Sequence, residues 1–441
     1  MSEFDKVIGY RSIKKELEQI SDTLKHMEVY RDLGVSAPHG LLLHGEPGVG
    51  KTLMASALIA ESGRPVFVCR KDKPNGQFVD EIRNTFERAA AAAPSIVFLD
   101  DMDKFANADD RHTDAEEYVT VQSCIDENKG KDIFVLATAN SLRCLPRSLK
   151  RCGRFDRVIE VDTPSGKDAE RIIAHYLEGK KFVSGIDLPT ITRILHGHSC
   201  AQLETVINEA GLLAGYERSA EITMDHLVTA CLRVIYDMPE PDDDDYDDFD
   251  EGTPSEHPTD QGTTDRAVLL HEAGHAVVSE VLVPGSVTLV TSRLNSGNEM
   301  AFTAYYHPEN CSRYLWRVSR IMTALGGMAA TEIMLGIPDM GNGRDLSMAA
   351  RETRNLIMDN GLSGLGLVED DFRNSNDRSV RQENAAENLL NQYYAQVKRI
   401  LLDNRELFDR IAGELEEKKL LTCREISQIR ENTRIVPMKM F

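Results

Sequence analysis

Two histidines four residues apart, with a glutamate between them, are the residues of this chain best suited to metal chemistry. The stretch reads His271-Glu272-Ala273-Gly274-His275. Side chains four apart lie on one face of a helix, so both imidazoles can reach a single metal ion. Glu272 falls beside that face, where a carboxylate can accept a proton from a metal-bound water. The stretch predicts metal-assisted hydrolysis, with an accidental match in an amphipathic helix as the alternative.

A catalytic zinc site needs a third protein ligand and keeps one position for water. The acidic candidates downstream are Glu332, Asp339 and Asp345. Asp345 follows a glycine-rich segment and precedes a predicted helix over 347–358, where an aspartate is also a common N-cap. Glu332 lies in a predicted helix over 326–335, where packing or hydrogen bonding would account for it equally well. The residues alone leave the third ligand open.

A glycine-rich loop in the first half has the residue types that hold a nucleoside triphosphate. It follows an apolar run at 41–44 and precedes a helical pattern at 53–60, which is the strand–loop–helix context of a phosphate-binding loop. Its main-chain N–H groups can wrap the phosphates, Lys51 supplies charge, and Thr52 supplies a hydroxyl for Mg²⁺. The loop reads Gly45-Glu46-Pro47-Gly48-Val49-Gly50-Lys51-Thr52. It predicts ATP and Mg²⁺ binding rather than an ordinary turn.

Two further apolar runs end in polar residues that suit ATP hydrolysis. The run at 95–99 ends in Asp100 and Asp101, and Asp100 matches the metal-side acid of such a site. The run at 133–139 ends in Asn140, which can orient a water near the γ-phosphate. Arg151 and Arg154 follow and are candidates for fingers inserted into a neighbouring subunit, with surface salt bridging as the alternative.

The amino-acid composition limits the class of protein to which this chain can belong. The 441 residues suggest two or three domains, and a net charge of −21 argues against binding nucleic acid through a general basic surface. The eight cysteines form no CxxC pair and no signal peptide precedes them, which predicts reduced thiols in a cytoplasmic protein. No apolar run is long enough for a transmembrane segment.

An acidic stretch divides the chain. Residues 237–260 carry twelve acidic side chains, no Lys and no Arg, a composition that favours a solvated tether. We therefore predict an α/β nucleotide-binding subdomain at 1–163, a helical lid at 164–236, an acidic linker at 237–262 and a metallopeptidase domain at 263–441. Within the last domain, 287–290 and 301–305 read as strands, and an edge strand there could bind an extended peptide.

The order of the motifs resembles that of the FtsH family of ATP-dependent zinc proteases, over nearly the whole chain from Val7-Ile8-Gly9 onwards. The resemblance implies an AAA P-loop module with a small helical lid, followed by a mainly α-helical zinc metalloprotease domain. It implies that the backbone near Ile8 meets the adenine and that Asp345 is the third zinc ligand. It also implies a homo-oligomeric ring, a hexamer, in which Arg151 and Arg154 act in trans.

Four features depart from the family pattern. Asp101 stands where the family has a glutamate that positions the attacking water, which predicts slow ATP hydrolysis. The pore-loop stretch 73–76 keeps Gly76 but lacks the aromatic, and Phe78 is either its substitute or a core residue. The family's Asp-Gly-Phe signal is not visible around Ile125-Asp126-Glu127, and because the ATPase pattern begins almost at Met1 we expect no amino-terminal membrane anchor.

The expectation is an ATP-dependent zinc endopeptidase that degrades cytosolic proteins, with weak unfolding power. One alternative is a nucleotide-gated peptidase of unfolded peptides. The other is an AAA ring that binds clients without processing them. Each predicts a different response of proteolysis to nucleotide.

Overall fold

The computed structural model describes residues 2–71, 77–105, 115–151, 153–238, 261–292, 301–307, 311–337, 343–358 and 375–438. The chain forms two compact units, each of which is described by itself. Unit 1 comprises Met1–Leu188 with Leu195–Ala230, and unit 2 comprises Pro189–Ile194 with Cys231–Phe441.

A five-stranded parallel sheet lies at the centre of unit 1, with the strand order β2-β3-β4-β1-β5. The strands are β1 (Gly40–His44), β2 (Val66–Cys69), β3 (Ser95–Leu99), β4 (Ile133–Ala139) and β5 (Arg157–Glu160). Their near-continuous apolar sequences fit a sheet that is covered on both faces. Every residue of β1 and β3 is buried.

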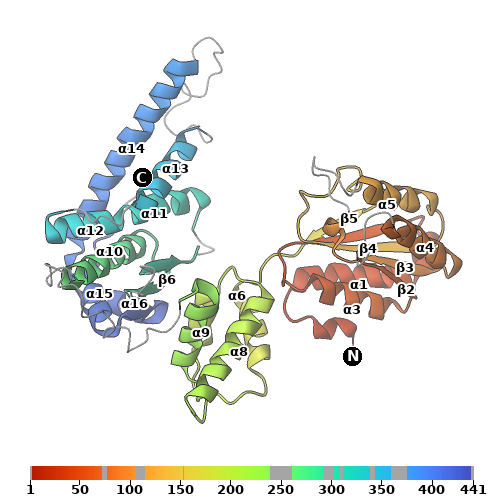
Figure 1. The fold of residues 1–441 in the computed structure, drawn as a ribbon, viewed down its shortest axis with the longest axis horizontal. Coiled ribbons are helices and arrows are strands. Elements are labelled where there is room, and N and C mark those ends of the chain that lie inside the picture. The colour runs from red at the N-terminus through yellow and green to blue at the C-terminus, as the bar shows by residue number, and fades with distance from the viewer. Residues whose placement is uncertain are drawn as a thin grey trace, which may run out of the picture. The chain divides into compact units, whose positions relative to one another are not determined.

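Alternate side chains of β1 point into two separate cores. Leu41 and Leu43 pack in the core formed with α1 and α3, whereas Leu42 packs in the core formed with α4 and α5. Figure 1 shows α1 and α3 together on one side of the sheet. The helical elements of this part are η1 (Glu3–Lys6), α1 (Arg11–Lys25), α2 (Met27–Asp32), α3 (Lys51–Ser62), α4 (Gln77–Ala91), η2 (Met102–Lys104) and α5 (Ala115–Glu127). The arrangement confirms the predicted α/β class and brings the carboxyl ends of the strands to one edge, where ligands of such sheets bind.

Helices follow the sheet, as the periodicity at 164–236 predicts. They are α6 (Gly166–Leu177), α7 (Leu188–Ile194), α8 (Cys200–Tyr216) and α9 (Met224–Tyr236). Ser199 begins α8 with a capping box, since its hydroxyl accepts from the backbone of Gln202 while the Gln202 side chain accepts from the Ser199 backbone. This cap fixes the start of α8, which contributes to the nucleotide cavity described below.

Unit 2 is mostly helical around one small antiparallel sheet of order β7-β6-β8. Its remaining elements are α10 (Gln261–Leu282), β6 (Val287–Thr291), β7 (Phe302–Tyr305), α11 (Arg313–Ala324), α12 (Gly326–Leu335), α13 (Gly343–Met358), α14 (Ser375–Asp403), α15 (Arg405–Lys418), β8 (Leu420–Thr422) and α16 (Cys423–Glu431). The helix α10 is central, with Ala273, Ala276 and Val277 fully buried among the surrounding helices. The predicted helices and both predicted strands of this half are confirmed.

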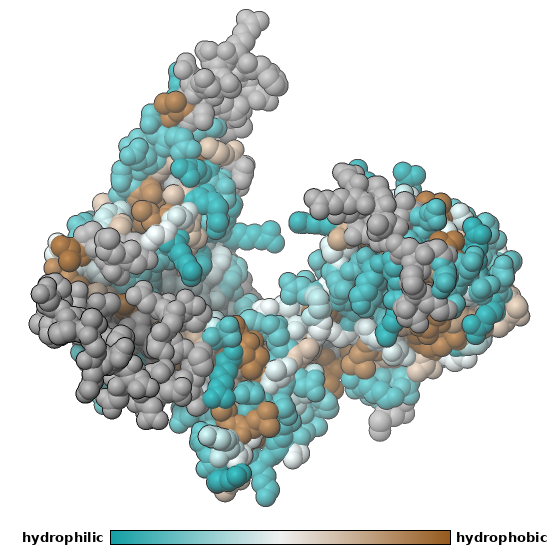
Figure 2. Space-filling view, in the orientation of Figure 1, coloured by the Kyte–Doolittle hydropathy of each residue, from teal (hydrophilic) through white to brown (hydrophobic). Residues whose placement is uncertain are grey.

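The face seen in Figure 2 is mainly hydrophilic, with apolar residues in small groups. The seven cysteines that the structure describes are all free thiols, in agreement with the prediction. Among the described helices, none has the length and apolar character needed to cross a bilayer.

Candidate active sites

The two histidines of α10 and Asp345 of α13 converge on one point. The Nε2 atoms of His271 and His275 lie 2.9 Å apart, and each lies 3.2 Å from Asp345 Oδ2. Ligand atoms held about 2 Å from a tetrahedral zinc ion would lie roughly 3.3 Å from one another. The three donors therefore fit a zinc ion, and they are the one such group among the described residues. Asp345 is the third residue of α13, so the N-cap interpretation of this residue is wrong.

Charge and hydrogen bonds hold the three donors in place. The Nδ1–H of His275 donates to the carbonyl of Thr323 at 2.6 Å, which turns Nε2 toward the other two donors. Burial disfavours a charged imidazole, but the hydrogen bond that His275 donates to Asp345 and the charge of Glu272 outweigh it and raise the pKa of His275 to about 9. Burial likewise opposes ionisation of Asp345, yet the hydrogen bonds from the two histidines hold its pKa well below its usual range. Binding of a dication requires that these donors be deprotonated, so metal affinity at this site depends on pH.

Two glycines make room for this cluster. A Cβ on Gly327 of α12 would lie 2.4 Å from Nε2 of His271. A Cβ on Gly274, inside the motif, would lie 2.5 Å from the carbonyl oxygen of Gly326. The lack of a side chain at Gly274 therefore lets the backbone of α12 approach α10 closely. The sequence does not predict the role of Gly327.

Glu272 lies beside the donors and is 6% exposed. Its Oε2 accepts a hydrogen bond of 2.7 Å from the Thr303 hydroxyl of β7. Burial raises the pKa of Glu272, which suits a group that takes up and releases a proton. Thr303 is a positioning residue that the sequence did not reveal, because it is 31 residues away along the chain.

The runner-up ligand lies in a different set of contacts. The carboxylate of Glu332 accepts from Lys398 Nζ at 2.7 Å and from the Tyr394 hydroxyl, so it is engaged with α14. This arrangement argues against Glu332 as the third ligand. Asp339 lies outside the described residues.

Unit 1 contains a cavity of about 690 Å³ between the phosphate-binding loop and the lid. Its lining includes Ile8, the loop residues 47–54, Asp101 and Asn140, together with Ala201 at the start of α8. The volume is in the range of small-molecule and cofactor sites. Apart from the finger candidates, the predicted nucleotide residues that do not line it are Gly45, Glu46 and Asp100, and these contact Lys51 or Thr52.

The phosphate-side residues meet as the motif predicts. Lys51 Nζ donates to the carbonyls of Gly45 and Glu46 at 2.7 Å each and to Asn140 Oδ1 at 3.0 Å. The Thr52 hydroxyl lies 3.5 Å from Asp100 Oδ1, a separation that leaves room for both oxygens to bind one Mg²⁺. Three neighbouring parallel strands therefore place these groups at one edge of the sheet.

A cation that the sequence did not predict pairs with Asp100. The guanidinium of Arg70 forms an ion pair with Asp100 Oδ2. The register of β2 with β3 pairs Cys69 with Leu99, so the next residues, Arg70 and Asp100, lie side by side. Arg70 therefore occupies an oxygen of the carboxylate that would hold Mg²⁺.

Comparisons with known proteins agree with both sites. Residues 41–163 match the model of the AAA family, "ATPase family associated with various cellular activities", and residues 261–429 match that of peptidase family M41. The chain is 30% identical to an ATP-dependent zinc metalloprotease FtsH of Ureaplasma parvum, over 98% of this chain and 61% of that protein. It is 30% identical to an FtsH of a Synechococcus species over 98% of this chain and 70% of that protein. The chain belongs to the FtsH family of ATP-dependent zinc metalloproteases. It is also 30% identical to FtsH 2 of Symbiobacterium thermophilum, covering 97% of this chain and 74% of that protein.

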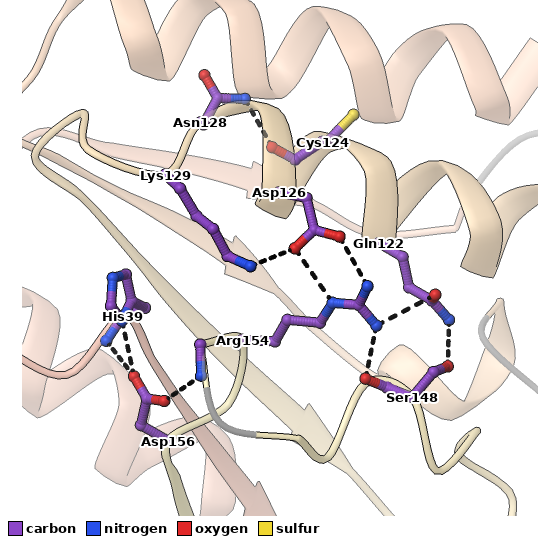
Figure 3. A network of polar contacts seen from close by, with 10 residues as sticks. His39, Gln122, Cys124, Asp126, Asn128, Lys129, Ser148, Arg154 and Asp156 are labelled. Atoms are coloured by element: carbon purple, nitrogen blue, oxygen red, sulfur yellow. Dashed lines mark hydrogen bonds and ion pairs between the residues drawn. The ribbon is translucent and has the colours of Figure 1, made fainter.

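The two FtsH finger candidates have different surroundings. Arg154 forms ion pairs with Asp126, at 2.7 Å from Nη2 to Oδ2, and donates to the Ser148 carbonyl at 2.6 Å (Figure 3). Its side chain is 18% exposed, whereas Arg151 is exposed. Through these contacts Arg154 stabilises the loop that carries Arg151. Asp126 is the ion-pair partner of Arg154 within this chain, although it is not part of an Asp-Gly-Phe sequence.

Two other departures from the FtsH pattern can be placed. Asp101 adopts a left-handed backbone conformation with φ 53°, and its Oδ2 accepts from Lys104 Nζ at 2.7 Å. Phe78 is fully buried against Phe105, with ring centroids 5.0 Å apart, so it is a core residue and not a substitute pore aromatic. The stretch 73–76 lies outside the described residues.

Proposed function

We propose that this chain is an ATP-fuelled zinc endopeptidase. The observation that carries the proposal is the convergence of His271, His275 and Asp345 beside the buried carboxylate of Glu272. Residues 1–163, with the lid at 164–236, would bind and hydrolyse ATP. Residues 263–441 would cleave peptides. The chain spans 61% of the length of the Ureaplasma relative. The activity, substrates and partners of the whole protein are therefore proposed here.

The residues of unit 2 have distinct roles in peptide hydrolysis. His271, His275 and Asp345 would hold zinc, which supplies Lewis-acid polarisation of a carbonyl and a lowered pKa of water. Glu272 accepts a proton from the attacking water and delivers it to the leaving amine, while Thr303 holds the carboxylate in place. Among the described strands β7 pairs with β6 alone, so its other edge is available for an extended peptide.

The residues of unit 1 would bind and hydrolyse ATP. Lys51 binds the outer phosphates, Thr52 and Asp100 hold Mg²⁺, and Asn140 orients the attacking water with Asp101. Hydrolysis is slow because Asp101 is one methylene shorter than glutamate. Arg151 completes the site of a neighbouring subunit, which requires a ring, and a hexamer is the form we propose.

The clients we propose are unfolded or weakly folded cytoplasmic proteins. The free state of the seven described cysteines supports a reducing compartment. The net charge of −21 argues against nucleic acid as a partner.

Degradation of labelled casein tests the proposal when it is measured with ATP, without nucleotide and with a nonhydrolysable ATP analogue. Cleavage that requires ATP hydrolysis supports it. Equal cleavage in all three reactions would instead indicate a peptidase that does not depend on its ATPase. A zinc-loaded protein that cleaves casein in none of the three reactions would instead indicate an AAA ring that binds clients without processing them.

A further inference from the structure

A tyrosine with no role in the steps above lies against the peptidase site. Tyr305 is the last residue of β7 and is two residues beyond Thr303. Side chains two apart on a strand lie on the same face, so Tyr305 shares the face on which Thr303 contacts Glu272. β7 is also the edge strand beside which an extended peptide would lie.

The contacts of Tyr305 place its phenol among the reacting groups. Its phenol is near enough to the Thr303 hydroxyl and to the carboxylates of Glu272 and Asp345 for all three groups to affect its pKa. The guanidinium carbon of Arg320, on α11, lies 4.5 Å from the centre of the Tyr305 ring. The ring is thus packed against a cation, and its place on β7 puts it on the face where Thr303 contacts Glu272.

The phenol is a hydrogen-bond donor under working conditions. A tyrosine ordinarily ionises near pH 10. Burial and the negative charge of Glu272 raise the pKa of Tyr305 further. The phenol O–H is therefore retained at neutral pH.

Peptide hydrolysis places negative charge on the oxygen of the scissile carbonyl, and a preorganised donor at that oxygen lowers the barrier. We propose that Tyr305 is a further catalytic residue, whose phenol O–H donates a hydrogen bond to this developing oxyanion. The proposal rests on the proposed peptidase function. Arg320, stacked on the ring, is a positioning residue that fixes the phenol and adds positive charge behind it.

The step is balanced without any proton transfer from Tyr305. As the water oxygen bonds to the carbonyl carbon, the π pair moves onto the carbonyl oxygen and the water proton passes to Glu272. When the tetrahedral intermediate collapses, the C=O bond reforms, the C–N bond breaks, and the nitrogen takes the proton from Glu272. Tyr305 stabilises the oxyanion between these events and keeps its own proton throughout.

Tyr305→Phe is a sharp test because it removes the hydroxyl and keeps the ring under Arg320. Loss of one oxyanion donor lowers kcat by about 100-fold or more, so we expect casein and quenched-peptide cleavage to fall by that order. KM, zinc content and ATPase rate should stay within about twofold of the wild type, since the donor acts in the transition state. Tyr306→Phe is the matched control, one residue along and on the opposite face, and should cleave normally.

Binding separates the proposal from a slow step elsewhere in the ATP cycle. A phosphinic pseudopeptide has a tetrahedral anionic oxygen at the scissile position, whereas the matched reduced-amide pseudopeptide has none. Tyr305→Phe should weaken the phosphinic ligand about tenfold and leave the reduced-amide ligand unchanged. If the wild type and Tyr305→Phe bind the phosphinic ligand equally well, the role of Tyr305 is overturned. The proposed peptidase function would still stand in that case, provided that the wild type cleaves its substrates. A wild-type protein that cleaves neither casein nor peptide would instead remove the proposed function and this inference with it.

Discussion

Replacement of Gly327 by alanine tests the geometry of the metal site through a residue that carries no ligand. The added Cβ would lie 2.4 Å from both Nε2 and Cε1 of His271. Ordinary contacts between such atoms are about 3.5 Å, so the imidazole has to move by roughly 1 Å. Ligand distances in metal sites are held to about 0.2 Å, so the displaced Nε2 can no longer bind as it did.

The size of the effect follows from two opposing contributions. Alanine in a helix is favoured over glycine by up to about 1 kcal/mol, whereas overpacking costs about 1–3 kcal/mol. The net loss of folding stability is therefore at most about 3 kcal/mol, which is below the roughly 5–15 kcal/mol that stabilises an ordinary domain, so the domain stays folded. Loss of the contacts that orient a ligand costs about 10- to 100-fold in metal affinity, so we expect zinc to bind up to about 100-fold more weakly, or about 2.7 kcal/mol.

The assay is zinc per chain after dialysis against a graded series of chelator, with casein cleavage and ATPase rate measured on the same samples. Gly413→Ala is the control, because a Cβ there meets nothing within 4 Å in the middle of α15. It should bind zinc normally and be slightly stabilised. If Gly327→Ala keeps wild-type zinc affinity and peptidase activity, the packing of α12 against His271 is not as described.

Four further predictions concern the ATPase unit. Asp101→Glu should raise the steady-state rate of phosphate release by on the order of tenfold, because the longer side chain reaches the water position; a slower variant would contradict the reading of Asp101. Arg70→Ala should lower several-fold the Mg²⁺ concentration needed to bind a fluorescent ATP analogue, and an unchanged midpoint would mean that Arg70 does not compete with the ion. Arg151→Ala should abolish ATP hydrolysis at unchanged melting temperature and regain part of it when mixed with Lys51→Ala subunits. Arg154→Ala, unlike Arg151→Ala, should lower the melting temperature. A variant that melts at the wild-type temperature would argue against a role of Arg154 in stabilising the loop.

The parts of both sites that lie within a contiguous motif were predictable from the sequence. The helix that carries His271 and His275, and the strand–loop–helix around Lys51, are each dictated by neighbouring residues. Asp345 was chosen through the family resemblance, since three acidic residues were equally open on local grounds. The structure favours it because Glu332 is engaged with Lys398.

Contacts between distant segments were not predictable. Arg70 meets Asp100 only because two strands pair in parallel with a particular register. Gly327 meets His271 only because α12 packs closely on α10. Such contacts depend on the packing of whole elements, which leaves no local pattern in the residues themselves.

The Glu272→Gln protein offers the most direct test of the central claim that a carboxylate beside a three-ligand zinc site drives peptide hydrolysis. Zinc per chain and ATP-dependent casein cleavage are measured together on this variant and on the wild type. We predict one zinc per chain in both proteins and cleavage in the wild type alone. Cleavage by Glu272→Gln at the wild-type rate, or a wild type that cleaves casein while holding no stoichiometric metal, would contradict the account.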